Sequence, residues 1–306
     1  GRARAAAGRI ARATGARVSS ETSNKRVERG IGRVPVERVP YPVDAALAFL
    51  KDVRHLILIG SRAPVAFFAY PGRPSLLAPN ECEVHTMATP EEDLERALEW
   101  LADELGVAAE APSIAAPQID TSVPVSGSLT AAAVNRIMLS VLPEHAIVCD
   151  ESVTSGRDLA IYNVAAAPHD WLQITGGAIG IGLPMATGAA VACPDRKVVV
   201  MQADGSGMYT IQALWTQARE RLNVLTIVYA NRSYATLHGE MTRVGVENPG
   251  RNAHRMMDLD DPAINWVDLA RSMGVEAMRA DTVEAFTRCV QAAMNQQGPM
   301  LIEAVI

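Results

Sequence analysis

The sequence predicts an α/β fold made of two doubly wound parallel-sheet domains. Short apolar segments typical of strands alternate along the chain with segments of helical periodicity. Hydrophobic residues make up 49% of the 306 residues but aromatic residues only 5%, which favours helices packed on a sheet through Ala, Val, Ile and Leu. Asp150, Asp204 and Asn231 each follow an apolar segment, where ligands bind in such folds.

The first domain is predicted over residues 1–110. A strong helix start lies near its end, because Thr89 can cap, Pro90 suits the first position and acidic residues follow. The predicted elements, in order, are a helix at 1–14, a loop at 17–42, a helix at 45–51, a buried strand at 56–60, short strands at 75–77 and 83–85, and a helix from 89 to about 105.

Residues 111–126 are rich in Pro, Ser and Ala and predict a linker. The second domain is predicted over residues 127–306, again with alternating helices and strands. Its predicted elements are helices at 128–141, 183–192, 209–221, 231–241, 266–273 and 283–295, and strands at 146–150, 197–203, 224–230 and 300–306.

Charge and composition exclude several classes of function. The net charge is −6, so the chain has no broad basic surface for nucleic acid. No apolar run reaches the roughly 20 residues that cross a bilayer, so no membrane association is expected. The four cysteines form no CxxC pair, which favours reduced thiols and a cytoplasmic location over zinc binding or disulfides. The Arg- and Ala-rich start could be a transit peptide, but an amphipathic helix is favoured.

Asp204 and Asn231 are the candidate metal ligands. They are 27 positions apart at the ends of two predicted strands joined by a helix, which brings both to one sheet edge. A carboxylate and an amide oxygen suit Mg²⁺, whose other ligands come from phosphate and water. Gly205 would allow close approach of a phosphate, and Ser206 could donate to it. Alternatively, Asp204 starts a plain turn and Asn231 caps a helix.

A glycine-rich segment at 175–188, TGGAIGIGLPMATG, favours a cofactor over a turn and a cap. A dinucleotide fingerprint would close a strand, open a helix and be followed by an acidic residue about 20 positions later. The positions of Gly180, Gly182 and Pro184 do not match that spacing. The segment therefore does not indicate NAD.

These motifs resemble those of the thiamine-diphosphate (ThDP)-dependent decarboxylase and acetolactate synthase superfamily. Its metal signature is Gly-Asp-Gly, about two dozen residues, then Asn-Asn, and here the chain has Ala203-Asp204-Gly205 and Ala230-Asn231. The segment 206–234 looks especially like benzoylformate decarboxylase, and the whole chain resembles an acetolactate synthase large-subunit homologue. The resemblance implies a middle domain followed by a ThDP diphosphate-binding domain.

The resemblance also assigns site residues. It implies that Gly177 accepts from the aminopyrimidine amino group and that Ile179 props the cofactor in its bent form. The bend brings that amino group next to the thiazolium carbon that loses a proton. The metal ligands implied are Asp204, Asn231 and the backbone carbonyl of Ser233, and the diphosphate-binding residues implied are Gly205, Ser206, Thr154 and Tyr234.

Two positions depart from the family signature. Ala203 replaces the first Gly, and Ala230 replaces the first Asn. Neither is a metal ligand in the pattern, so metal binding is expected to survive. The extra methyl of Ala203 could weaken cofactor affinity.

The catalytic Glu of the family lies on a pyrimidine-binding domain that precedes these two, so the chain is expected to be the C-terminal part of a longer one. None of Glu151, Glu220 or Glu240 is expected to replace it. His238 is expected to face solvent or a partner rather than act as an acid or base, and the other histidines have no metal spacing. FAD is not expected, because the acidic residues that follow the flavin-contacting Arg in some relatives are absent after Arg62.

The resulting functional hypothesis is ThDP- and Mg²⁺-dependent carbon–carbon chemistry on a small 2-oxo acid, of the acetolactate synthase type, in a homodimer or homotetramer. Benzoylformate-type decarboxylation is the alternative, because both reactions begin with addition and loss of carbon dioxide. A cofactor-binding subunit without catalytic activity is a second alternative, motivated by Ala203 and Ala230.

Overall fold

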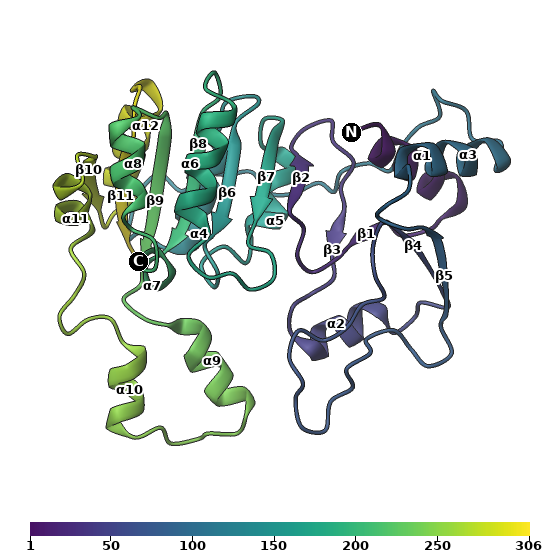
Figure 1. Ribbon diagram of the computed structural model, residues 1–306, viewed down its shortest axis with the longest axis horizontal. Helices are drawn as coiled ribbons and strands as arrows, with labels where there is room; N and C mark the ends of the chain where they lie inside the picture. The colour runs from purple at the N-terminus through teal and green to yellow at the C-terminus, as the bar shows by residue number, and fades with distance from the viewer. The chain divides into compact units, whose positions relative to one another are not determined.

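A seven-stranded sheet with the order β10-β11-β9-β8-β6-β7-β2 dominates the structure, a computed structural model that describes residues 1–306 (Figure 1). Neighbouring strands are parallel throughout, except that β2 pairs antiparallel with β7. The strands of this sheet are β2 (Arg26–Arg29), β6 (Ile147–Glu151), β7 (His169–Gln173), β8 (Val198–Ala203), β9 (Val224–Ala230), β10 (Glu276–Ala280) and β11 (Met300–Val305).

This sheet belongs to one of two units, which comprises residues 25–32 and 118–306. Its helices are α4 (Ala131–Val141), α5 (Leu159–Tyr162) with the 3₁₀ turn η1 (Asn163–Ala165), α6 (Gly182–Ala192), α7 (Asp204–Gly207), α8 (Ala213–Arg219), α9 (Ala235–Arg243), α10 (Arg251–Met257), α11 (Trp266–Ser272) and α12 (Val283–Asn295).

Two apolar cores cover the two faces of the sheet. Side chains alternate along a strand, so Val199 of β8 joins a core with α4 and α12, while Val198 and Val200 join a core with α6, α8 and α11. Burial on both faces explains why β8 and β9 are continuous apolar runs. The α/β prediction is confirmed for this unit.

The other unit comprises residues 1–24 and 33–117. Its sheets are small: β4 pairs parallel with β5, and β1 pairs parallel with β3. Its elements are α1 (Arg2–Thr14), β1 (Ser19–Ser20), β3 (Glu37–Arg38), α2 (Val43–Leu50), β4 (His55–Ile59), β5 (Glu83–Ala88) and α3 (Leu94–Glu104). Residues 111–117 of the predicted linker fall in this unit and 118–126 in the other.

Three local expectations from the sequence are wrong. The predicted loop at 17–42 contains β1, β2 and β3, and the predicted strand at 75–77 forms only one bridge, between Leu76 and Val65. The helix predicted from residue 89 begins at Leu94, and its cap is Asp93 rather than Thr89. The strands β7 and β10 and the helix α10 escaped prediction because their sequences are polar or mixed. None of the helices combines the length and apolar character that crossing a membrane requires.

Asp170 of β7 fastens the antiparallel edge strand β2. Its carboxylate accepts from Nε of Arg26, on β2, at 2.8 Å and from a guanidinium nitrogen of Arg196 at 2.7 Å. Desolvation acts to raise the pKa of Asp170, but the two guanidinium groups outweigh it and lower that pKa below its usual value.

Replacing Asp170 with asparagine is expected to lower the free energy of unfolding at pH 7 by about 1–3 kcal/mol. A lowered pKa means that the contribution is complete above the pKa of the unfolded state, near 4, and disappears as pH falls through the folded pKa. Urea unfolding at pH 7 and pH 3 measures it, with exposed Asp195→Asn as control. An equal loss at both pH values would contradict the ion-pair account.

Candidate functional site

Four loops meet at one edge of the seven-stranded sheet, because β6, β7, β8 and β9 are parallel and end there. The register of β8 and β9 pairs Ala203 with Tyr229, so the residues after each strand follow side by side. In Figure 1, α7 and the start of the segment leading to α9 emerge at the same edge. This edge therefore holds the residues that the sequence singled out.

Asp204 begins the short helix α7 directly after β8 and is buried. Its carboxylate accepts from the backbone N–H of Gly205 at 2.8 Å and of Arg232 at 2.7 Å. Desolvation raises the pKa of Asp204 and outweighs these hydrogen bonds, which act to lower it. The bond to Arg232 places the carboxylate against the loop that follows β9.

The loop after β9 holds Asn231 and Ser233 in a fixed turn. Arg232 has φ of 55°, a left-handed conformation that few non-glycine residues adopt. This conformation lets Arg232 donate to Asp204, while the side-chain oxygen of Asn231 accepts from the N–H of Ser233 at 3.0 Å. The N–H of Leu259 donates to the carbonyl of Arg232 at 2.7 Å, which anchors the loop.

A divalent cation fits these residues. The hydrogen-bond partners of the buried Asp204 carboxylate are backbone N–H groups, and a cation would offset the desolvation that raises its pKa. The side-chain oxygen of Asn231 accepts one hydrogen bond and retains a second lone pair. Carboxylate, amide and carbonyl oxygens are hard ligands of the kind that Mg²⁺ prefers. The proposed set of Asp204, Asn231 and Ser233 is chemically consistent.

Gly205 and Ser206 lie in α7, both buried. A Cβ on Gly205 would lie 2.4 Å from Cε1 of Tyr234, so the ring of Tyr234 covers this glycine. The hydroxyl of Ser206 donates to the carbonyl of Ala203 at 3.2 Å and accepts from Nε2 of Gln202 at 2.7 Å. Three of the proposed diphosphate residues, Gly205, Ser206 and Tyr234, therefore lie beside the metal ligands.

Glu151, the last residue of β6, links the glycine-rich segment to this site. Its carboxylate accepts from the backbone N–H of Gly180 at 2.5 Å and of Gly182 at 2.6 Å. Nε2 of Gln202 lies 3.2 Å from the same carboxylate and also donates to Ser206. A Cβ on Gly182 would lie 2.4 Å from Oε1 of Gln202 and 2.8 Å from Oε2 of Glu151, so a side chain there would displace both groups.

This role of Glu151 was not predicted from the sequence. A signal was present, because an acidic residue that ends a buried strand needs partners, and a glycine-rich loop offers backbone N–H groups. The partners lie 29 to 51 residues away in the chain, however, so only the fold brings them together. Through these contacts Glu151 positions the glycine-rich segment.

Gly177 and Ile179 form an exposed turn after β7. Gly177 has φ of 67°, and its carbonyl accepts from the N–H of Ile179 at 2.8 Å. The side chain of Ile179 is large and apolar and is 45% exposed. An apolar ligand surface above the turn would cover it.

Thr154 follows β6 in a turn and is half-buried. The preceding residue, Val153, has φ of 50°, a strained conformation for a β-branched side chain. Like Arg232 after β9, it lies just beyond a strand end at this edge. Such outliers persist where the surrounding structure holds them and often mark binding sites.

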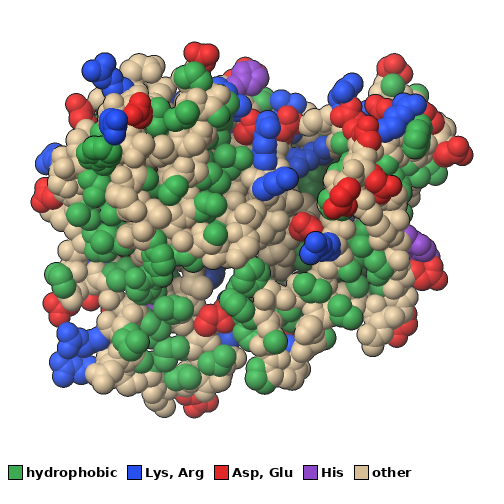
Figure 2. Space-filling view, viewed as in Figure 1, with side chains coloured by type: hydrophobic (Ala, Val, Ile, Leu, Met, Phe, Trp, Pro, Cys, Tyr) green, Lys and Arg blue, Asp and Glu red, His purple; other side chains and the backbone are tan.

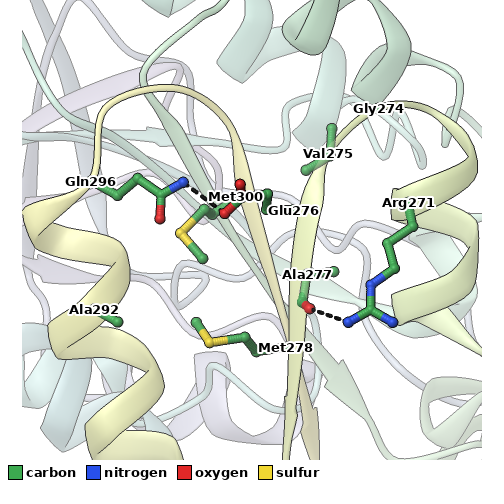
Figure 3. A pocket seen from close by; sticks show the side chains of 9 residues that line it. All are labelled: Arg271, Gly274, Val275, Glu276, Ala277, Met278, Ala292, Gln296 and Met300. Atoms are coloured by element: carbon green, nitrogen blue, oxygen red, sulfur yellow. Dashed lines mark hydrogen bonds between the residues drawn. The ribbon is translucent and has the colours of Figure 1, made fainter.

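A cavity of about 480 Å³ lies elsewhere in this unit (Figure 3). Glu276 and Met300 begin β10 and β11, so the cavity lies at the amino ends of the strands, opposite to the strand-end site. A side-chain bond from Gln296 to Glu276 at 2.8 Å crosses one side of it (Figure 3). Its lining residues are Arg271, Gly274, Val275, Glu276, Ala277, Met278, Ala292, Gln296 and Met300.

Comparisons with known proteins identify relatives of this chain. Residues 154–304 match the family model described as "Thiamine pyrophosphate enzyme, C-terminal TPP binding domain". An acetolactate synthase large-subunit homologue, IlvX of Mycobacterium tuberculosis, is 47% identical over 98% of this chain and 58% of its own length. Benzoylformate decarboxylase of Pseudomonas aeruginosa is 29% identical over 69% of this chain and 39% of its own length.

A solved structure shows the same fold. The ThDP-dependent 4-hydroxybenzoylformate decarboxylase of Rhodococcus jostii RHA1 superposes with a TM-score of 0.78 and 24% identity, over 99% of this chain and 58% of that one. This chain thus spans well under two thirds of the relatives that it matches. By its motifs, its strand-end site and these matches, the chain belongs to the ThDP-dependent decarboxylase and acetolactate synthase superfamily.

Proposed function

We propose that the whole protein uses ThDP and Mg²⁺ for carbon–carbon chemistry on small 2-oxo acids, in the manner of acetolactate synthases. The observation that carries the proposal is that hydrogen bonds fix two segments at one edge of the sheet, the loop after β9 and the glycine-rich segment after β7. Arg232 donates to Asp204 on one side, and Glu151 holds Gly180 and Gly182 on the other. When bound, ThDP supplies the carbon nucleophile for the 2-oxo carbonyl.

The residues of this chain have two tasks in the proposal. Asp204, Asn231 and the carbonyl of Ser233 would hold Mg²⁺, which would supply positive charge for the diphosphate. Gly205, Ser206, Thr154 and Tyr234 would contact the diphosphate itself. These groups keep the charged end of the cofactor fixed.

Gly177 and Ile179 act on the other end of the cofactor in the proposal. The carbonyl of Gly177 accepts from the aminopyrimidine amino group, and the side chain of Ile179 supports the bent form. The exposed position of Ile179 on a turn whose glycines have positive φ supports this role, because the turn projects the side chain outward. Because Ile179 is already partly buried, covering the rest of its side chain would contribute on the order of 1 kcal/mol to binding.

The two departures from the signature leave the backbone unstrained. Ala203 has φ of −72° and ψ of 144°, which any L-residue adopts. Ala230 ends β9 within the regular ladder and is buried. Neither methyl group forces the loops into a new conformation, which favours a cofactor-binding enzyme over a subunit that has lost its site.

Benzoylformate-type decarboxylation is the second candidate. The match to benzoylformate decarboxylase over 69% of this chain favours it. The two candidates share the loss of carbon dioxide and differ in what captures the remaining fragment. A second pyruvate gives acetolactate, whereas a proton gives an aldehyde.

Product analysis of the whole protein tests the proposal. With ThDP and Mg²⁺, two molecules of pyruvate are expected to give one acetolactate and one carbon dioxide. Formation of benzaldehyde and carbon dioxide from benzoylformate, with no acetolactate from pyruvate, would select the second candidate. If neither acid releases carbon dioxide, both assignments are wrong.

A further inference from the structure

Two histidines and a glutamate gather on the parallel strands β4 and β5. His55 opens β4, Glu83 opens β5, and the register pairs these two residues directly. His85 lies two positions beyond Glu83, so the pleat turns both side chains to the same face. The sequence spacing gave no sign of this cluster, because His55 lies 28 positions before Glu83 and reaches it only through the strand register.

The distances within the cluster are compatible with a shared metal ion. Oε2 of Glu83 lies 3.4 Å from Nδ1 of His55 and 3.5 Å from Nε2 of His85. Both separations exceed the 2.7–3.2 Å of ordinary hydrogen bonds. They agree with the roughly 3.3 Å that separates two ligands on a tetrahedral ion with bonds of about 2.0–2.1 Å.

The two histidine nitrogens also lie near each other. Each residue offers one ligand atom, and all three atoms lie within 4.8 Å of one another. The imidazole rings of His55 and His85 are stacked, with centroids 5.9 Å apart and planes inclined by 22°. Both nitrogens therefore lie within a few ångströms of the Glu83 oxygen.

The chemistry of the ligands indicates which ion they would take. Two imidazoles and one carboxylate suit Zn²⁺ and related transition ions, whereas Mg²⁺ prefers oxygen ligands alone. The side chains of His55, Glu83 and His85 are 63%, 67% and 55% exposed, so water can reach a fourth coordination position. The cluster resembles an open site with three protein ligands rather than a closed structural one.

We propose that His55, Glu83 and His85 bind a divalent transition ion of the zinc class, with water completing the coordination. These three residues belong to the other unit, and none of them is among the residues proposed to bind ThDP or Mg²⁺. The zinc proposal can therefore be tested separately from the proposed 2-oxo acid chemistry.

A second group of possible metal ligands, His238, His254 and Asp258, serves as a comparison for the first. Nε2 of His238, on α9, lies 2.9 Å from Oδ1 of Asp258, and His254 stands nearby. This separation is an ordinary hydrogen bond, so the carboxylate already has a partner. Asp258 also forms a backbone bridge with Ser233 of the strand-end loop. His254→Ala therefore removes a competing histidine without touching β4 or β5.

Titration with Co²⁺ and Zn²⁺ tests the site on the whole protein after treatment with chelator. Co²⁺ is expected to give the visible absorption of a four-coordinate ion, and calorimetry to give one Zn²⁺ per chain at this site. His55→Ala and His85→Ala should each weaken Zn²⁺ binding by on the order of tenfold or more and abolish the Co²⁺ absorption. His254→Ala and the exposed His145→Ala should change neither.

Circular dichroism of each variant checks whether these surface substitutions leave the fold intact. Absence of Zn²⁺ binding by the stripped protein would overturn the proposal. So would binding that survives both His55→Ala and His85→Ala, or that disappears only in His254→Ala. Loss of Zn²⁺ binding with unchanged ThDP affinity would uphold the site and show that the two sites are separate.

Discussion

Replacing Asp204 with alanine is expected to weaken Mg²⁺-dependent ThDP binding by on the order of 100-fold, because the variant removes the one anionic protein ligand of the proposed set. The carboxylate sits at the end of β8, and its two partners are backbone N–H groups. No other proposed ligand carries charge to compensate. Calorimetric titration of ThDP into the whole protein, with saturating Mg²⁺, measures the change.

Two variants separate charge from structure. Asp204→Asn retains an oxygen that can accept from Gly205 or Arg232, so it preserves more of the turn while removing the charge. It should lose nearly as much affinity as Asp204→Ala. Asp195→Ala, at an exposed position, should bind ThDP as the unmodified protein does. Unchanged affinity in Asp204→Ala would refute the assignment of the metal ligand.

Replacing Glu151 with alanine is expected to lower the free energy of unfolding by about 3–5 kcal/mol. The variant leaves the buried N–H groups of Gly180 and Gly182 without their acceptor and removes a contact of Gln202. Each unsatisfied buried donor costs about 1–3 kcal/mol. The glycine-rich segment should also lose its fixed position, so ThDP affinity should fall in protein that remains folded. Urea unfolding and ThDP titration measure the two effects.

A control variant lies near the amino end of the same strand. Glu144 is exposed, and Glu144→Ala should change stability by no more than about 0.5 kcal/mol. Glu151→Gln should fall between the two, because one oxygen remains but its NH₂ group then faces a backbone N–H donor. Equal stability of Glu151→Ala and Glu144→Ala would contradict the role assigned to Glu151.

The sequence predicted the helices and strands whose pattern of apolar residues matches the side chains that the fold buries. The helix predicted at 283–295 matches α12 because the capping residue Thr282 and the spacing of the apolar residues both indicate a helix that begins there. The strands β8 and β9 were evident because burial on both faces makes them continuous apolar runs. Asp204 and Asn231 could be placed at one edge for the same reason, since each follows such a run.

Elements at the margins of the sheet carried no such pattern. The edge strand β2 reads Arg-Val-Glu-Arg, and only Val27 is fully buried, so its four residues resemble a loop. Its pairing with β7 depends on Asp170, 144 residues beyond Arg26. Long-range partners of this kind cannot be found by periodicity.

The same limit applies to the sites. Glu151 could be seen as an acidic residue near a strand end, but its bonds to Gly180 and Gly182 depend on the order of strands in the sheet. His55 meets Glu83 only through the register of β4 and β5. Short motifs identified the cofactor class, while the residues that position them or form separate clusters required the fold.

Titration of ThDP into the unmodified whole protein, once with Mg²⁺ and once with excess chelator, tests the central claim most directly. The account predicts tight binding of one ThDP per site with Mg²⁺ and a loss of affinity on the order of 100-fold without it, because Asp204 and the diphosphate are both anionic and need the cation between them. Equal affinity under both conditions would show that this edge of the sheet does not hold the diphosphate through a metal.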